Sequence, residues 1–233
     1  MALQSQPVKP SVKCKTMMEP TVYLDTNIYK FSATKLTRLR PRTKVLKWGD
    51  LEFEGVVHDF VTVNPNDKII NPELRTEVNI LPELAEFGKE GKVKYIIQTE
   101  TLLESWGIPN MDSRSGKFYG APIDYAKAPI QYERVLVGGF EGPQEMQFDF
   151  LAGIKNKRFE KLQKITGAYQ GPGKLNRNQL LDAFHIWCAE YNKCNFFLTL
   201  DLKLIKVINK GGANRLSTRL IRPSELLAEL RNT

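Results

Sequence analysis

The chain has 233 residues, of which 42% are hydrophobic and 26% charged, a composition typical of a folded globular protein rather than a disordered or fibrous one. Its 34 Lys and Arg residues against 26 Asp and Glu residues give a net charge of +8, which favours a polyanionic partner such as nucleic acid without requiring one. No apolar run is long enough to cross a bilayer, so no membrane partner is expected.

The length suits one large α/β domain, or a compact domain that carries a sizeable insertion. Residues 1–19 mix Lys, Gln, Ser and Pro without any hydrophobic period, which predicts a flexible tail and no signal peptide. The three cysteines, Cys14, Cys188 and Cys194, form no Cys-x-x-Cys pair, so no zinc ligand set can be assembled from their spacing. We therefore expect reduced thiols and a cytoplasmic protein.

The first third of the chain predicts a strand, a helix and a basic segment. Thr21 to Leu24 (TVYL) suits a buried strand, and residues 28–39 have a helical pattern. The helix leads into the basic residues 34–47, where Pro41 must interrupt it. Residues 51–66, with partly alternating β-formers around Gly55, predict a short hairpin or a pair of edge strands.

The middle third predicts two helices, a strand and a long loop. Asn71 and Pro72 are typical of a helix start, and the helix over residues 74–90 should break at Pro82. Residues 92–98 (KVKYIIQ) predict a buried strand. The helix that follows, over 99–106, contains a Thr and a Glu at capping-box spacing, Thr101 and Glu104. Residues 107–143, rich in Gly, Pro, Ser and Asp, form a loop of a length typical of functional or mobile segments.

The last third is the most regular. Residues 144–165 predict one amphipathic helix, and residues 178–191 predict a second, largely buried helix. Residues 195–201 (NFFLTLD) and 215–221 (RLSTRLI) predict two strands, followed by a helix that begins at Pro223 or Ser224. This order predicts a three-layer α/β/α fold with a central, mainly parallel sheet.

Acidic residues stand where these predicted strands and helices meet. Asp25 and Asp201 each end an apolar strand, at the edge where open α/β sheets bind ligands. Glu100 and Glu104 follow a third strand at a spacing of four, on one helix face. Asp182 lies near the start of a helix that is apolar on two sides. For any one of them the plain alternative is a helix cap, which accepts backbone N–H bonds.

Carboxylates that converge in one crevice repel one another and raise their own pKa values unless a cation lies between them. Mg²⁺ and Mn²⁺ prefer oxygen ligands, so either would suit such a site. A metal ion held in this way can activate water and stabilise the leaving oxygen of a phosphodiester. Together with the basic composition, this pattern favours a nuclease.

Five segments resemble the successive signatures of PIN-domain nucleases: YLDTN, TETLLES, LLDAFHIWCAE, FFLTLD and IRPSELL. The resemblance covers roughly residues 21–33, 93–106 and 178–230. It implies one PIN-like domain over 20–233 with insertions at about 34–91 and 107–177. It further implies metal-binding acids at Asp25, Glu104, Asp182 and Asp201, polar support from Asn27 and Thr199, and Glu100 as the alternate to Glu104. His185 has a packing role in this reading.

The leading hypothesis is a Mg²⁺- or Mn²⁺-dependent ribonuclease, with RNA preferred to DNA as the partner. The rival is a catalytically silent PIN-fold module that binds nucleic acid or acts as a scaffold. An antitoxin-like protein partner stays open, although the extra length favours a stand-alone nuclease. A small-molecule phosphohydrolase would need a Gly-rich phosphate loop after the first strand, and DTNIYK supplies none.

Two groups of basic residues are candidates for nucleic-acid binding, and each could equally be solvated surface. The first comprises Arg38, Arg40, Arg42, Lys44 and Lys47, and the second comprises Lys157, Arg158, Lys161 and Lys164.

Overall fold

The computed structural model describes residues 19–106, 117–133, 142–211 and 213–232. Its centre is a five-stranded sheet in which every neighbouring pair is parallel, in the order β5-β4-β1-β6-β7. The strands are β1 (Thr21–Leu24), β4 (Lys94–Ile97), β5 (Ile123–Tyr125), β6 (Phe196–Leu198) and β7 (Arg219–Ile221). The predicted parallel α/β sheet is therefore confirmed.

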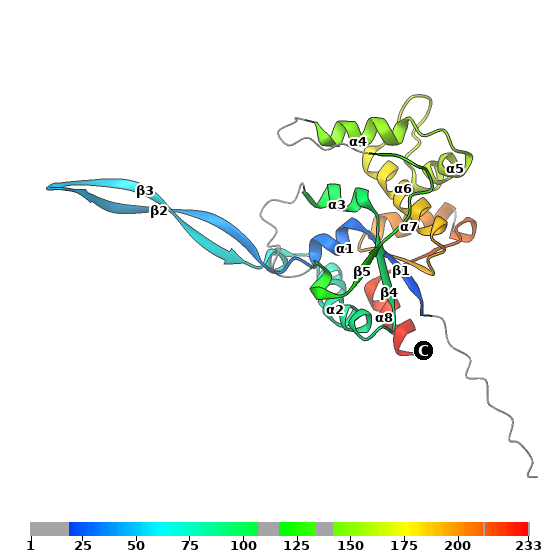
Figure 1. Ribbon diagram of the computed structural model, residues 1–233, viewed down its shortest axis with the longest axis horizontal. Coiled ribbons are helices and arrows are strands. Elements are labelled where there is room, and N and C mark those ends of the chain that lie inside the picture. Colours follow the sequence, from blue (N-terminus) through cyan, green and yellow to red (C-terminus); the bar gives the residue numbers. More distant parts are fainter. Residues whose placement is uncertain (1–18, 107–116, 134–141, 212, 233) are drawn as a thin grey trace, which may run out of the picture.

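Helices cover both faces of this sheet (Figure 1). Side chains alternate across it, so Val22 and Leu24 face one layer while Tyr23 faces the other. The first layer contains α1 (Thr26–Phe31), α2 (Pro72–Lys89) and α8 (Pro223–Arg231), and the second contains α4 (Pro143–Ala152), α5 (Lys157–Thr166), α6 (Arg177–Tyr191) and α7 (Leu202–Gly211). The predicted three-layer arrangement is confirmed.

The remaining short elements connect these layers. Helix α3 (Thr99–Trp106) follows β4 and packs Leu102 against the α1–α2–α8 layer. Single 3-10 turns lie at η1 (Pro65–Lys68) and η4 (Ala213–Arg215), and η3 (Lys117–Gly120) is a turn in which Phe118 and Tyr119 have positive φ.

The helix predicted over residues 28–39 is present only as far as Phe31, and a long antiparallel ribbon follows it. Helix α1 ends at Phe31, and β2 (Leu36–Trp48) then pairs with β3 (Leu51–Val63) over their whole length. The prediction of a short hairpin or a pair of edge strands within residues 51–66 was wrong, because the turn lies at Gly49 and Asp50 and residues 51–63 form one strand. Pro41 is tolerated within β2 because each strand of a two-stranded ribbon has a free edge that needs no N–H donor. The ribbon projects from the body of the protein (Figure 1).

Two further helix boundaries differ from the prediction. Pro82 does not break α2, because it lies on the exposed side while Leu81, Leu84 and Ala85 are buried against the sheet and hold the helix. The single helix predicted over 144–165 is two helices. Gly153 ends α4 and Asn156 caps α5, accepting bonds from the first backbone N–H groups of that helix.

Two elements were not predicted, and one predicted cap is absent. Strand β5 lies within the segment expected to be a loop, and α7 lies between the last two strands. Thr101 caps nothing, because α3 begins at Thr99 and the Glu104 carboxylate lies elsewhere. The expected tail over residues 1–18, together with parts of the predicted loop 107–143, falls outside the described residues. Within those residues, no helix combines the length and the apolar character that crossing a membrane requires.

Candidate functional site

The site lies where the strand order of the sheet reverses. From β1 the chain continues to β4 and β5 on one side, and it then crosses back to β6 and β7 on the other side of β1. Leu24 at the end of β1 pairs with Leu198 at the end of β6. Asp25 and Thr199 directly follow these two residues. In open α/β sheets ligands bind beyond the carboxyl ends of the strands at such a switch point.

Asp25 is a buried carboxylate, with 4% of its surface exposed, and it is held by three donors. Its Oδ1 accepts a hydrogen bond from Thr26 N at 2.8 Å. Its Oδ2 accepts bonds from Asn27 Nδ2 and from Thr199 Oγ1, both at 2.6 Å. The two residues expected to support the site therefore contact this carboxylate and fix its orientation.

Burial raises the pKa of Asp25 to about 6, against an ordinary value of 3.8. The Thr199 hydroxyl and the charge of His185 oppose this increase, while the charge of Glu104 adds to it. The carboxylate is therefore held in place by its donors but is costly to ionise in the absence of a cation.

Glu104, from α3, joins the site through Thr26 and His185. Its Oε2 accepts hydrogen bonds from Thr26 Oγ1 and, at 3.1 Å, from His185 Nε2. Burial alone would raise the pKa of Glu104, but the hydrogen bond and charge of His185 hold it below its ordinary value, with help from Arg177. The protein itself therefore stabilises the Glu104 carboxylate as an anion.

The sequence prediction gave His185 only a packing role, and the structure shows more. The ring is buried, with 1% exposure, and its Nδ1 lies 2.9 Å from the Tyr23 hydroxyl while Nε2 meets Glu104. Burial lowers its pKa, but the hydrogen bond and charge of Glu104, together with the charges of Asp25 and Asp182, raise it, so the net change is upward. The spacing of three between Asp182 and His185, which places both on one side of α6, is the sequence signal that could have revealed this role.

Asp182, on the second turn of α6, has a carboxylate whose ionised form is disfavoured by its surroundings. Burial raises its pKa well above the ordinary value, and the charges of Asp25, Asp201 and Glu104 raise it further. Within the described part of the chain, the Asp182 carboxylate accepts no hydrogen bond. The four predicted acids therefore lie close enough to affect one another electrostatically, and Asp182 needs a proton or a cation.

Asp201 has a structural task as well as a place at the site. Its Oδ1 accepts hydrogen bonds from Lys203 N at 2.8 Å and Leu204 N at 3.0 Å, which caps α7. Thr199 Oγ1 accepts a bond from Asp201 N at 2.9 Å while donating to Asp25. One hydroxyl thus connects the two strand-end acids.

The acids are neighbours, but they are not gathered around one point. No three His, Cys, Asp or Glu side chains in the described ranges are placed to hold one metal ion together. The oxygen-only donor set and the raised pKa values of Asp25 and Asp182 fit a hard divalent cation. Joint coordination would require side-chain rotation.

Glu100, the alternate to Glu104, points to a different neighbourhood. It is fully buried, and its carboxylate accepts bonds from the Tyr132 hydroxyl at 2.9 Å and from Gln147 Nε2 at 2.8 Å. These contacts connect α3 to α4 and to the segment after β5. Of the two candidates, only Glu104 contacts the residues around Asp25.

The two predicted basic groups lie on separate elements. Those of the first group, Arg38, Arg40, Arg42, Lys44 and Lys47, are on β2 of the ribbon. In the second group, Lys157 is exposed on α5, and Arg158 forms an ion pair with Glu190. Lys161 and Lys164 line a hollow of about 450 Å³ together with Arg158 and Arg215. Arg215 was not part of the predicted group, because only the fold brings η4 beside α5.

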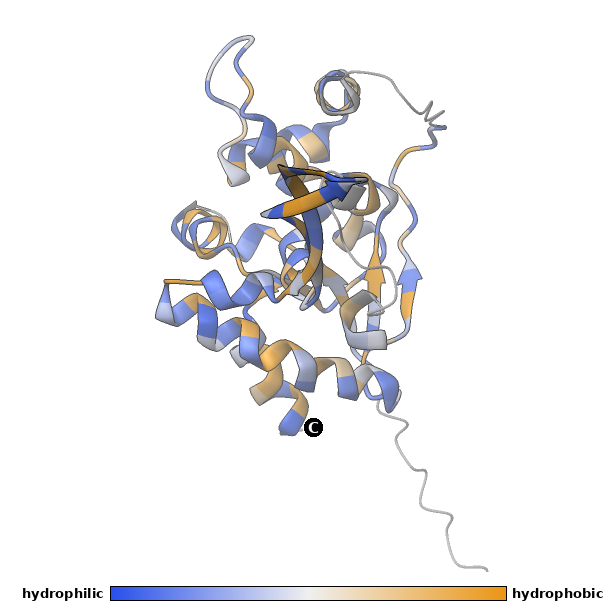
Figure 2. Ribbon diagram, turned by 90° about the vertical axis from the view of Figure 1, so that its left-hand side faces the viewer, coloured by the Kyte–Doolittle hydropathy of each residue, from blue (hydrophilic) through white to orange (hydrophobic). Residues whose placement is uncertain are grey.

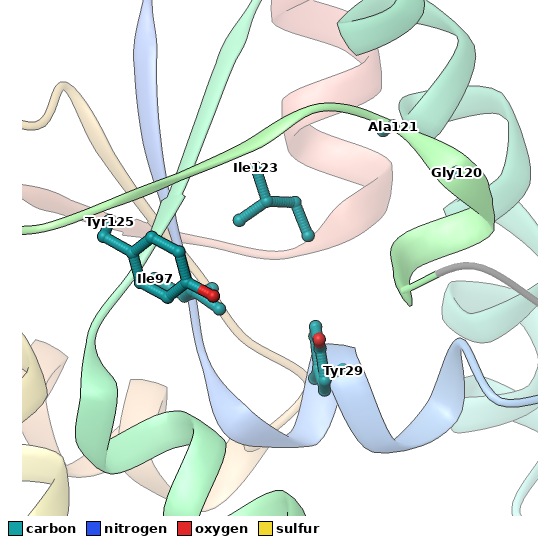
Figure 3. A pocket seen from close by; sticks show the side chains of 6 residues that line it. All are labelled: Tyr29, Ile97, Gly120, Ala121, Ile123 and Tyr125. Carbon is teal, nitrogen blue, oxygen red and sulfur yellow. The ribbon is translucent and has the colours of Figure 1, made fainter. Parts of the chain in front are cut away.

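A second hollow, of about 290 Å³, lies beside α1 and is lined mainly by apolar side chains (Figure 3). Tyr29 projects from α1 toward Ile123 and Tyr125 of β5, with Ile97 between the elements. Burial raises the pKa of Tyr29, so its hydroxyl stays protonated. None of the four predicted acids lines this hollow.

Comparison of the sequence with protein-family models and with curated proteins gives no match.

Proposed function

We propose that this protein is a Mg²⁺- or Mn²⁺-dependent nuclease of the PIN type that hydrolyses phosphodiester bonds in RNA. The observation that carries the proposal is the position of Asp25, Glu104, Asp182 and Asp201 at the switch point of a parallel sheet. Asp182 in particular is half-buried beside three other acids, and its partial burial together with their charges raises its pKa. A divalent cation would remove that repulsion.

The residues of the chain would divide the work as follows. Asp25, fixed by Asn27 and Thr199, would be the central metal ligand. Asp182 and Glu104 would approach the ion from α6 and α3, and Asp201 would supply the oxygen that does not cap α7. When bound, the cation would supply an activated water and charge stabilisation at the scissile phosphate.

His185 would hold the Glu104 carboxylate in position. It is buried, and it joins Tyr23 to Glu104 through its two ring nitrogens. A ring held at both nitrogens cannot rotate freely, so it would fix the direction of the Glu104 carboxylate.

RNA is proposed as the substrate on the basis of the net charge of +8 and the PIN resemblance. The segments 34–91 and 107–177, which extend the chain beyond compact toxins of that family, favour a stand-alone cytoplasmic nuclease over a toxin with an antitoxin partner. Copurification of a small protein with the chain would favour the toxin.

One observation favours a second candidate. No three acids in the described ranges converge on a single point. A catalytically silent PIN-type module has no need of such convergence, so this arrangement would suit it. Such a module would bind nucleic acid or act as a scaffold without turnover.

The two candidates differ in one experiment. The full chain is incubated with end-labelled RNA of mixed sequence in Mn²⁺, in Mg²⁺ or in EDTA, beside the variants Asp25→Asn and Asp149→Asn. The enzyme predicts cleavage that needs metal, is lost in Asp25→Asn and is retained in Asp149→Asn, whose exposed carboxylate lies on α4. Equal cleavage by all three proteins, or none with Mn²⁺, would reject the nuclease.

A further inference from the structure

The β2–β3 ribbon is an arm that extends from the body of the protein. Its strands each have 13 residues and pair without interruption from Leu36–Val63 to Trp48–Leu51. Gly49, with φ 61°, occupies the first position of the two-residue turn, where type II′ hairpins need a positive φ. At ~3.3 Å per residue the arm is ~40 Å long. An isolated two-stranded ribbon is only marginally stable in water. This marginal stability is a physical reason to look for a partner that binds the ribbon.

The two faces of the ribbon carry different charges. Alternation and register place four cations but only one acid, Asp59, on the first face. The acids Glu52 and Glu54 lie on the second face, where Lys47 forms an ion pair with Glu52 at 2.5 Å. Figure 2, in which the ribbon points toward the viewer, shows hydrophilic and hydrophobic residues interspersed along it. The cations of the first face, here called the basic face, are Arg38, Arg40, Arg42 and Lys44.

The basic face presents its charges at a regular interval. Residues two apart in a strand are ~7 Å apart, so the four cations form a row of ~20 Å. Arg42 meets Asp59 at 3.1 Å, and all four side chains are exposed. Val57 and Val61 on the same face are partly covered, as expected where long basic side chains lay their stems over apolar neighbours.

The tip of the same face is aromatic and apolar. Trp48 is 81% exposed, Leu51 is 73% exposed and Phe53 is 47% exposed. The register puts these three residues on the face that carries the four cations. A row of cations that ends in exposed aromatic rings combines the two features by which proteins bind single-stranded nucleic acid, namely backbone neutralisation and base stacking.

We propose that the basic face of the ribbon binds single-stranded RNA, with phosphates along Arg38, Arg40 and Lys44 and a base stacked on Trp48. The inference deepens the proposed nuclease function by naming its substrate class and an arm that holds the substrate outside the acidic site. The ribbon leaves the body just beyond α1, the helix that Asp25 caps, so a bound strand can continue toward the switch point (Figure 1).

Single-stranded RNA is favoured over the other occupants by the contacts available. Bases in a duplex are already stacked and offer no face to Trp48, whereas unpaired bases do. A second copy of this chain, which has a net charge of +8, would meet the basic face with like charge.

The first test measures binding of a fluorescent 20-nucleotide RNA of mixed sequence by anisotropy in EDTA, across a range of salt. The triple variant Arg38→Gln, Arg40→Gln, Lys44→Gln keeps the Arg42–Asp59 pair. The matched control, Lys92→Gln, Lys94→Gln, Lys210→Gln, removes the same charge from the body. Removal of three phosphate contacts should make the plot of log K against log salt less steep, with a slope about 2 closer to zero, and should weaken binding roughly tenfold or more. The control should keep the wild-type slope.

The second test separates stacking from charge. Trp48→Ala should weaken binding roughly tenfold without changing the salt slope, and Trp48→Phe should restore most of the affinity. Far-UV circular dichroism of each variant establishes that the ribbon is retained.

Three outcomes would overturn the proposal. The first is a salt slope shared by the ribbon variant and the body control, and the second is a loss of affinity confined to a duplex RNA of equal length. The third is a wild-type protein that sediments as a dimer and a ribbon variant that sediments as a monomer with unchanged RNA binding. That result would assign the ribbon to self-association. Binding that depends on the ribbon, found in a protein that cleaves nothing with Mn²⁺, would support this inference while rejecting the nuclease.

Discussion

The hydroxyl of Thr199 donates to Asp25 Oδ2 at 2.6 Å, across the 174 positions that separate the two residues in the sequence. The same hydroxyl accepts a bond from Asp201 N. This side chain therefore connects the ends of β1 and β6, beside the contacts that Asn27 makes with Thr199 and Leu200.

Replacement of Thr199 by Val should expose this dependence. The buried carboxylate of Asp25 would lose one donor, so we expect a loss of about 1–3 kcal/mol in the free energy of unfolding and weaker Mn²⁺ binding. Thr199→Ser keeps the hydroxyl and should recover most of both. Denaturant unfolding and a Mn²⁺ titration measure the two effects. Equal values for the Val and Ser variants would show that the hydrogen bond contributes little.

The raised pKa of Asp25 predicts a pH dependence of stability in metal-free protein. A carboxyl whose pKa rises from 3.8 to about 6 on folding binds its proton more tightly in the folded state. Its favourable contribution is thus present below pH 4 and is lost as the pH rises through 6, by up to ~3 kcal/mol. Urea unfolding in EDTA between pH 4 and pH 7.5 should show this fall, and Asp25→Asn should make it smaller, leaving the part that comes from the raised pKa of Asp182. A wild-type curve that rises across this window would contradict the assignment.

Replacement of Asp182 should stabilise the metal-free protein and weaken its binding of Mn²⁺. The half-buried carboxylate of Asp182 accepts no hydrogen bond within the described residues, so Asp182→Asn removes a charge close to other acids without removing a hydrogen bond. We expect the metal-free protein at pH 7.5 to gain about 1–2 kcal/mol and to lose its stabilisation by Mn²⁺. Asp149→Asn, the exposed control, should change stability by less than ~0.5 kcal/mol and keep the response to Mn²⁺. Destabilisation by Asp182→Asn would show that this carboxylate has a structural partner.

The buried path from Tyr23 through His185 to Glu104 predicts coupled substitutions. Tyr23→Phe and His185→Gln each disturb the same bond, so their effects on unfolding should fail to add by at least ~0.5 kcal/mol. A double-mutant cycle measured by denaturant unfolding gives this coupling. Additive effects would mean that the ring and the phenol act independently.

Away from the site, replacement of Glu77 should lower the free energy of unfolding. Glu77 is buried, and its carboxylate accepts bonds from Ser224 N at 2.8 Å and Ser224 Oγ at 2.7 Å, which joins α2 to the start of α8. Glu77→Ala should cost about 1–3 kcal/mol. Glu83→Ala, which breaks an exposed ion pair with Arg231 between the same two helices, should cost less than ~1 kcal/mol. Similar losses in both variants would contradict this difference in burial.

The sequence predicted the sheet well where burial and local pattern agree. TVYL and KYII are short apolar runs with helix starts directly behind them, so both strands and the positions of Asp25 and Glu104 could be located. Asn71 was recognised as a cap because its side chain and the following Pro act locally. Such features depend on near neighbours and are visible in one dimension.

The errors arise where distant contacts decide. Pro82 stays in a helix because its buried neighbours hold α2 on the sheet, and Pro41 stays in a strand because the ribbon leaves it a free edge. Strand β5 has only three residues and is set by its pairing with β4, so a composition rich in Gly and Pro hid it. The role of His185 depends on Tyr23 and Glu104, 162 and 81 positions away in the sequence.

The central claim is tested most directly by anomalous diffraction from crystals soaked in Mn²⁺, compared between wild type and Asp25→Asn. The account predicts at least one manganese peak within coordinating distance of Asp25 and one or more of Glu104, Asp182 and Asp201, absent from the variant. Wild-type crystals without a peak at these side chains, or with manganese bound only elsewhere, would contradict it.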